Sequence, residues 1–364
     1  MKNNFSLLFK KASWLVALCM LIIACENEKT EIEKVDHTEA EKVYVNLSFP
    51  NQSSVFTLGD MVTIKSQFDT LIPFTKFELW VDNELVMLDS NSVDSMVISS
   101  KKMRVGSHTA LCKVFDSTKV VDIENLNFIL LSDIVPKVGK FKVIRSYPHL
   151  ITSFTQGLVY ENGKLYEGTG LNGESALKLV NLKTGDANKE LLLAQEYFGE
   201  GIAIVKNKII QLTWKNNVGF VYNKKTFEKV KEFNYPTEGW GVTFDGTNLI
   251  MSDGSEHLFI LDTANFSIIG KVQVYDDKGP VLKLNELEWV NGFVYANIWM
   301  TDYIVQIDAR SGKVIKQWEM SNLLSQEDKH PKIDVLNGIA INKSTGRYFI
   351  TGKNWPKLFE IELR

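Results

Sequence analysis

Glu200 is the residue best placed for acid–base chemistry in this sequence, because it lies between two glycines at the start of an apolar run. The stretch FGEGIAIVKNKIIQLTWKN, residues 198–216, has the alternation of a β-hairpin that turns at Lys206 and Asn207. Such a hairpin brings Glu200 and Trp214 to the same end of two paired strands. A carboxylate beside an indole at the end of a sheet is suited to moving a proton next to an apolar slot.

The same hairpin pattern occurs five times between residues 139 and 364, at intervals of about 40 to 50 residues. The units are GLVYENGKLYEGTG, GIAIVKNKIIQLTW, GVTFDGTNLIMSDGS, LEWVNGFVYANIWM and GIAINKSTGRYFITGKNW. Most of them continue into two further strands, as in ALKLVNLKTGD. Four-stranded units at this interval are typical of propeller blades, so residues 136–364 are predicted to form a five-bladed β-propeller.

The last unit has only three strands, because KLFEIELR alone follows GKNWP. The segment GKFKVIRSYP, residues 139–148, lies before the first full unit and has strand character. We expect this segment to pair with the last unit and close the ring, which removes the exposed edges of an open sheet.

In a propeller, the loops that enter the first strand of each blade and leave the second strand meet at one mouth of the central channel. The residues at these positions should therefore converge. They are Phe154, Gln156, Glu200, Trp214, Trp240, Asn285, Trp299 and Lys353. A single tryptophan or lysine at a strand end is often only packing or a solvated charge, so the shared position of all eight is what favours a site.

Ten fragments in this region resemble the signature series of the glutaminyl cyclase family of plants and bacteria. They are SFTQGL, YEGTG, FGEGIA, LTW, EGWGVT, SDGS, LNELEW, ANIW, LNGIA and TGKNWPKLFE, in the family's order from about residue 140 onward. YEGTG departs from the more usual YESTG at a turn. The resemblance implies a five-bladed propeller that converts the N-terminal glutamine of peptides or proteins to pyroglutamate and releases ammonia.

The residues suit this chemistry independently of the resemblance. The substrate's own α-amine attacks its γ-carboxamide carbon, so no serine or cysteine nucleophile is required, and no G-x-S-x-G motif is present. A proton acceptor and donors to the oxyanion remain to be supplied. Glu200 suits the first role, with Glu167 or Asp253 as the alternatives. Donors suit the second role: Lys353, Asn285, Gln156 and an indole N–H of Trp240 or Trp214.

Phe154 and Trp299 can wall a small slot that excludes water. The resemblance implies the same group of site residues, whereas the division of roles among them follows from the chemistry. Together these features predict a glutaminyl-peptide cyclotransferase, which is an acyltransferase of the aminoacyl class.

Metal chemistry is disfavoured, because the five histidines are isolated and no cysteine cluster exists. We therefore expect a metal-independent enzyme with no cofactor, while a structural divalent cation in the channel stays compatible with the sequence. One rival is a propeller lactonase that binds a cation through Glu200, Asn285 and Asp334. Lys353 argues against it, because a cationic side chain repels a metal. The second rival is a propeller that binds peptides without catalysis.

Residues 42–135 contain short alternating strands separated by polar turns, with no helix signal. This pattern resembles an immunoglobulin-like β-sandwich and carries no visible chemistry. A hairpin turn is expected at Asp82 and Asn83, and Trp80 and Cys112 are expected in the core. A spacer or adhesive role is the simplest interpretation of this part of the chain.

Residues 1–24 have a basic start and a short apolar run that ends in IIAC, which is similar to the lipobox of bacterial lipoproteins. We expect cleavage before Cys25, lipidation of Cys25 and a disordered, charged tether over residues 25–41. The protein is then an exported lipoprotein on the periplasmic or cell-surface side of a membrane. With a net charge of −3 and a pI near 6.0, no nucleic-acid partner is expected, and we predict a monomer.

Overall fold

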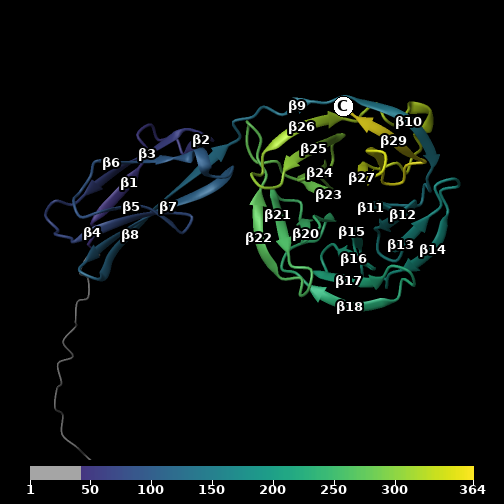
Figure 1. The fold of residues 1–364 in the computed structure, drawn as a ribbon, viewed down its shortest axis with the longest axis horizontal. Coiled ribbons are helices and arrows are strands. Elements are labelled where there is room, and N and C mark those ends of the chain that lie inside the picture. Colours follow the sequence, from purple (N-terminus) through teal and green to yellow (C-terminus); the bar gives the residue numbers. More distant parts are fainter. Residues whose placement is uncertain (1–41) are drawn as a thin grey trace, which may run out of the picture. The chain divides into compact units, whose positions relative to one another are not determined.

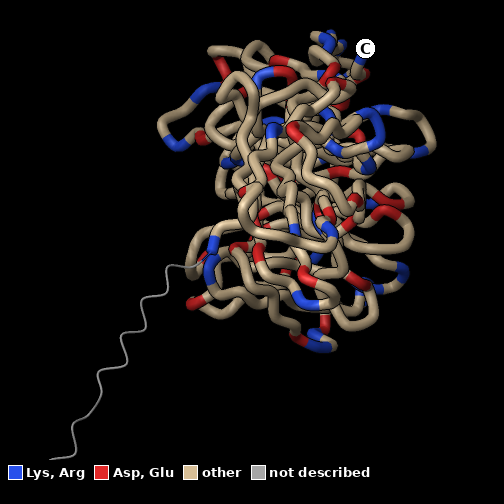
Figure 2. Tube along the Cα trace, turned by 90° about the vertical axis from the view of Figure 1, so that its left-hand side faces the viewer, with Lys and Arg blue, Asp and Glu red and all other residues tan. Residues whose placement is uncertain are grey.

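The computed structural model describes residues 42–364, and over this range the regular structure is β-strand apart from two short 3-10 turns, η1 (Ser100–Lys102) and η2 (Gln326–Asp328). The predicted signal peptide, the tether and Cys25 lie outside the described residues. Between residues 42 and 364, no helix is long and apolar enough to cross a bilayer. Acidic and basic residues are interspersed along the described chain (Figure 2).

Residues 42–131, the two-sheet region, form two sheets that share one apolar core. The first sheet contains β1 (Val45–Ser48), β3 (Met61–Phe68) and β6 (Ser95–Ser99). The second has the order β2 (Val55–Thr57), β8 (Lys119–Leu131), β7 (Gly106–Asp116), β4 (Lys76–Val81) and β5 (Glu84–Asp89). Alternate side chains point into the core, as the period of a strand requires.

The predicted turn at Asp82 and Asn83 is confirmed, and both residues have positive φ. Cys112 is fully buried in the core, and this burial raises the pKa of its thiol to about 12. The expectation for Trp80 is wrong. It points to the opposite face of β4 from the buried Phe77 and Leu79, where its indole N–H donates to Glu78.

The ring, residues 137–364, contains five sheets, each built from four strands that are antiparallel to their neighbours (Figure 1). Three of them follow chain order: β11 (Thr155–Glu161), β12 (Lys164–Thr169), β13 (Ala176–Val180) and β14 (Ala187–Leu192); β15 (Gly199–Val205), β16 (Lys208–Thr213), β17 (Val218–Asn223) and β18 (Lys229–Asn234); β19 (Val242–Phe244), β20 (Leu249–Ser252), β21 (His257–Leu261) and β22 (Ile268–Gln273). The fourth contains β23 (Leu284–Val290), β24 (Phe293–Ile298), β25 (Tyr303–Asp308) and β26 (Val314–Glu319), with β9 (Lys137–Val138) added parallel to β26.

The fifth sheet closes the ring with strands from distant parts of the sequence. It contains β27 (Leu336–Asn342), β28 (Arg347–Gly352), β29 (Lys357–Leu363) and, at the outer edge, β10 (Phe141–Pro148). β10 pairs with β29 from Phe141 opposite Leu363 to Pro148 opposite Lys357, so the predicted closing strand is confirmed.

The first strand of each sheet faces the centre of the ring (Figure 1). These inner strands, β11, β15, β19, β23 and β27, each contact the next, and β27 contacts β11. Glycines allow neighbouring inner strands to approach closely, because a side chain there would collide with the next strand's backbone. A Cβ on Gly201 would lie 2.7 Å from the carbonyl oxygen of Trp240, and a Cβ on Gly241 would lie 2.0 Å from the carbonyl oxygen of Asn285. A glycine next to Glu200 therefore serves packing around the ring.

Candidate active site

The start of four inner strands departs from regular pairing, and the polar residues of the site lie at these departures. The register shifts between Thr155 and Gly157 in β11, and between Gly199 and Ile202 in β15. Corresponding shifts occur from Leu284 to Leu287 in β23 and from Leu336 to Ile339 in β27. A bulge of this kind re-aims a side chain that a regular strand would direct elsewhere. The residues at these bulges include Gln156, Glu200, Asn285 and Asn337.

A cavity of about 290 Å³ lies at this end of the inner strands, and we call it the aromatic cavity. Its walls contain all eight residues that the sequence singles out: Phe154, Gln156, Glu200, Trp214, Trp240, Asn285, Trp299 and Lys353. Three further residues, Phe198, Met300 and Asp334, complete the lining. Phe198 belongs to the quoted FGEG fragment, so its position next to Glu200 was a usable signal.

Glu200 is the buried acid of the aromatic cavity, with 4% of its surface exposed. Its Oε1 accepts a hydrogen bond from Gln156 Nε2 at 3.1 Å. Burial raises the pKa of Glu200 well above its ordinary value; the charge of Lys353 opposes this rise and the charge of Glu238 adds to it. A poorly solvated carboxylate is a stronger base than one in water, which suits a proton acceptor.

Lys353 is buried as deeply as Glu200, and its Nζ lies 4.8 Å from the centre of the Phe154 ring. Its backbone pairs with the segment that precedes β27, because its N–H donates to Val335 and its carbonyl accepts from Asp334. Burial lowers the pKa of Lys353, while Glu200 and Asp334 oppose this change. A cation held in an apolar wall is well placed to stabilise negative charge that develops in the cavity.

The two indole N–H groups considered as oxyanion donors are both engaged by one carboxylate. Trp214 Nε1 donates to Glu238 Oε2 at 2.7 Å, and Trp240 Nε1 donates to the same oxygen at 3.0 Å. The expected donor role of these indoles is therefore wrong, because their protons point to Glu238. Glu238 lies two residues before Trp240 in EGWG, and the sequence interpretation missed it.

The aromatic walls are held by edge-to-face contacts. The ring of Phe198 lies 6.1 Å from that of Phe154 and 5.5 Å from that of Trp214, and Trp240 lies 5.5 Å from Trp299. Such pairs fix ring orientation beyond the effect of burial alone. The result is a slot with flat apolar sides and an acid, a lysine and two amides within it.

Asn285 offers this slot a polar group, since its Oδ1 is buried and has no hydrogen-bond partner in the part of the chain that the structure describes. An unpaired buried acceptor is costly unless a ligand or water satisfies it.

Asp334, the third ligand of the lactonase hypothesis, is exposed at the edge of the cavity. Between residues 42 and 364, no group of three or more His, Cys, Asp or Glu side chains is arranged to hold a metal ion.

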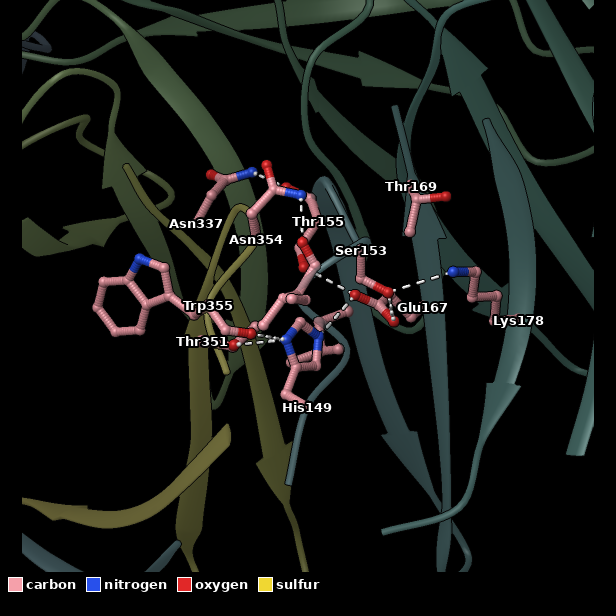
Figure 3. A network of polar contacts seen from close by, with 12 residues as sticks. His149, Ser153, Thr155, Glu167, Thr169, Lys178, Asn337, Thr351, Asn354 and Trp355 are labelled. Carbon is pink, nitrogen blue, oxygen red and sulfur yellow. Dashed lines mark hydrogen bonds and ion pairs between the residues drawn. The ribbon is translucent and has the colours of Figure 1, made fainter. Parts of the chain in front are cut away.

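The alternative proton acceptors lie outside the aromatic cavity. Glu167 is fully buried and accepts hydrogen bonds from His149 Nε2 at 2.9 Å and Thr155 Oγ1 at 2.7 Å (Figure 3). It serves as the centre of a polar network behind β11. Asp253 accepts from the N–H and hydroxyl of Ser255. Neither carboxylate lines the cavity, which leaves Glu200 as the buried acid there.

Comparison with known proteins adds three findings. Residues 121–363 match the model of the family described as glutamine cyclotransferase. A glutaminyl-peptide cyclotransferase of Arabidopsis thaliana is 37% identical over 237 residues, which is 64% of this chain and 74% of that protein. The crystal structure of Myxococcus xanthus glutaminyl cyclase superposes with a TM-score of 0.59 at 34% identity, over 63% of this chain and 98% of that one.

Proposed function

The chain belongs to the glutamine cyclotransferase family, and we propose that its glutaminyl-peptide cyclotransferase reaction takes place in the aromatic cavity. The substrate is a peptide or protein with an N-terminal glutamine. The product is the pyroglutamyl peptide, and ammonia is released. The observation that carries the assignment of the site is the meeting of a buried acid, Glu200, and a buried lysine, Lys353, inside one aromatic slot.

In the proposed mechanism, the slot folds the glutamine side chain back so that its α-nitrogen reaches the Cδ carbon. A new N–C bond forms, the amide carbonyl becomes an oxyanion, and Glu200 takes a proton from the attacking nitrogen. Glu200 then returns the proton to the departing NH₂ group as the C–N bond breaks. The atoms balance without a second substrate, so the reaction is an intramolecular acyl transfer.

The remaining groups support the charges that this sequence creates. The Lys353 ammonium stabilises the oxyanion, and the Asn285 carboxamide contributes an N–H donor while its unpaired oxygen accepts from the substrate's amine. Gln156 donates to Glu200, so we assign it to the carboxylate rather than to the oxyanion. Phe154, Trp214, Trp240 and Trp299 bind the glutamine side chain and exclude water.

The direct test uses residues 42–364 with a dipeptide amide that begins with glutamine. We expect ammonia and the five-membered lactam in equal amounts, and no reaction with the matched dipeptide that begins with asparagine, because its side chain is one carbon too short for this ring. Tight binding of the glutamine peptide without turnover would favour the peptide-binding hypothesis instead.

We also propose that catalysis needs no metal. The support is the position of Lys353, whose cation faces the same slot as Glu200 and Asn285 and disfavours a divalent ion there. Prolonged chelation followed by gel filtration should leave turnover unchanged. Loss of activity that returns only with an added divalent cation would contradict this proposal, and would point to a catalytic or structural ion in the channel.

We infer that the ring is a five-bladed β-propeller and that the two-sheet region is an immunoglobulin-like β-sandwich. Five four-stranded antiparallel sheets with contacting inner strands support the first assignment, and two sheets over one core support the second.

We further propose that residues 136–364 fold and react without the two-sheet region. A fragment that starts at residue 136 should keep its activity and unfold cooperatively, whereas one that starts at residue 150 lacks β10 and should be much less stable. Equal stability of the two fragments would show that β10 is not needed to stabilise the ring.

For localisation, we propose an exported, monomeric lipoprotein attached to a membrane only through Cys25. The support is the basic start, the short apolar run and the IIAC sequence. Replacing Cys25 with alanine should abolish incorporation of labelled lipid in the producing cells. Labelling that persists in this variant would exclude the proposed anchor.

A further inference from the structure

We infer that Asn337 is a positioning residue that sets the orientation of the Gln156 carboxamide and thereby which atom of Gln156 faces Glu200. Asn337 Nδ2 donates to Gln156 Oε1 at 3.2 Å, and Gln156 Nε2 donates to Glu200 Oε1 at 3.1 Å. The three residues are at least 96% buried, so these bonds are largely shielded from bulk water. The inference rests on the proposed role of Glu200 as proton acceptor.

The orientation of Gln156 matters because a glutamine amide presents either a donor or an acceptor when it turns by about 180° about its last bond. With Oε1 toward Glu200, two acceptors would face each other in a buried site, which is costly. Asn337 places an N–H donor where only the oxygen of Gln156 is a suitable partner. In this series of hydrogen bonds, Asn337 therefore donates to Gln156, and Gln156 donates to Glu200.

Asn337 itself is held in one orientation by a second bond. The same Nδ2 donates to the carbonyl oxygen of Thr155 at 3.0 Å, and Figure 3 shows Asn337 beside Thr155. Thr155 is fixed in turn from the other side, because its hydroxyl donates to Glu167. The buried network around Glu167 thus supports the segment that carries Gln156, without contact between Glu167 and the aromatic cavity.

The place of Asn337 in the fold supports the same conclusion. It lies at the bulge of β27, equivalent to Gln156 in β11, Glu200 in β15 and Asn285 in β23. Unlike those three, it does not line the aromatic cavity. Asn337 therefore reaches the cavity indirectly, through its bonds to the Gln156 side chain and to the backbone of the neighbouring Thr155. The bond from Gln156 occupies Oε1 of Glu200, which leaves Oε2 for the substrate's amine.

A double-mutant cycle tests this inference. Asn337→Ala and Gln156→Ala should each lower kcat about tenfold with KM changed less than about threefold, and the double variant should lose little more than either single one. Asn337→Asp keeps the shape but replaces the donor with an acceptor, so it should lower kcat at least as much as Asn337→Ala. It also serves as the second variant where the alanine variant does not fold.

The matched control is Asn297→Ala, because Asn297 is a buried asparagine whose Oδ1 accepts from the N–H of Gly338, next to Asn337. It should lower the Tm, and its effect on kcat should multiply with that of Gln156→Ala. Independent, multiplying losses for Asn337→Ala and Gln156→Ala, or near-normal kcat in folded Asn337→Asp, would overturn the inference. Absence of turnover in the unaltered protein would instead overturn the proposed function.

Discussion

The inner strands of the ring have a cavity at each end, and the two cavities differ in what surrounds their buried acid. At the starts of the strands, Glu200 lies among aromatic rings and faces Lys353. At the opposite ends, a cavity of about 240 Å³ is lined by Glu288, Thr243, Trp289 and the turns after the inner strands. Glu288 is also buried, and burial raises its pKa to about 8.

The partners of the two acids explain the difference. Glu288 Oε1 accepts from the backbone N–H of Ile341, so this carboxyl group joins neighbouring inner strands. Glu200 accepts from a side chain that is itself held in place, next to a buried cation and an unpaired amide oxygen. A raised pKa by itself therefore does not identify a catalytic acid, whereas the chemistry of its neighbours does.

The largest expected effect separates the two acids directly. Glu200→Gln keeps the shape of the side chain and removes the proton acceptor, so kcat should fall on the order of 10²-fold or more. Glu288→Gln should change kcat by less than about threefold, because glutamine resembles the protonated form that the raised pKa favours at pH 7. Both variants should be checked for folding by thermal unfolding. Similar losses in the two would remove the distinction between the cavities.

A second comparison uses one lysine from each cavity. Lys353→Met should lower kcat about 10- to 100-fold, since it removes the charge that supports the oxyanion while keeping the apolar contact with Phe154. Lys343→Met, at the opposite cavity, should leave kcat within about twofold of the unaltered protein. Steady-state kinetics with a glutamine dipeptide amide at saturating concentration gives both values. An unchanged kcat in folded Lys353→Met would exclude Lys353 from the oxyanion role.

The pH profile should show how Glu238 affects the aromatic cavity. Glu200 accepts a proton only in its ionised form, and its pKa is raised, so kcat should fall on the acid side well above the pH at which ordinary carboxyl groups titrate. Glu238→Gln removes one cause of this rise, so the acid limb should move to lower pH. An acid limb that stays fixed in folded Glu238→Gln would show that the charge of Glu238 does not reach Glu200.

Because Glu238 also holds two tryptophans, its replacement should raise KM a few-fold. Trp214→Phe is the matched control, since it removes one indole N–H from Glu238 and keeps the charge. It should raise KM without moving the acid limb. A shift of the acid limb in Trp214→Phe would mean that geometry, and not charge, sets the titration of Glu200.

The smallest expected effect is that of Glu288, in the opposite cavity, on how the stability of the protein depends on pH. The folded-state pKa of Glu288, about 8, lies above the unfolded value near 4.5, so its neutral form contributes stability at low pH that is lost as pH rises through 8. Glu288→Gln cannot ionise and should lose less stability than the unaltered protein between pH 5 and pH 9. Parallel Tm curves for the two proteins over this range would contradict the raised pKa.

Much of this arrangement follows from the sequence, because the hairpin repeat identifies which residues lie at the same end of the inner strands. All eight residues chosen in this way line one cavity. In the sequence prediction, Lys353 and not Asn337 represents the fifth unit, although LNGIA places Asn337 at the position equivalent to Glu200. A count of equivalent positions across all units would have found it.

Hydrogen-bond partners were harder to predict, because they depend on side-chain directions that a repeat does not specify. The two indole N–H groups point to Glu238, which lies on a loop between sheets rather than on a strand. Trp80 is a different case, because strand alternation places it on the same face as Lys76 and Glu78, opposite Phe77, Leu79 and Val81. The signal for its outward position was therefore present in the sequence, and the size and apolar character of the indole outweighed it in the prediction.

The pairing of β10 with β29 has a consequence for how the protein is made. Phe141 and Leu363 are neighbours in the finished sheet, although more than two hundred residues separate them along the chain. A ribosome therefore releases almost the whole ring before its two ends can meet. Until β29 is made, the outer edge of β28 and the edge of β10 both lack their partner strand. The chain must be protected from aggregation over this interval. A stop codon at position 357 would remove strand β29 and leave a sheet edge permanently exposed.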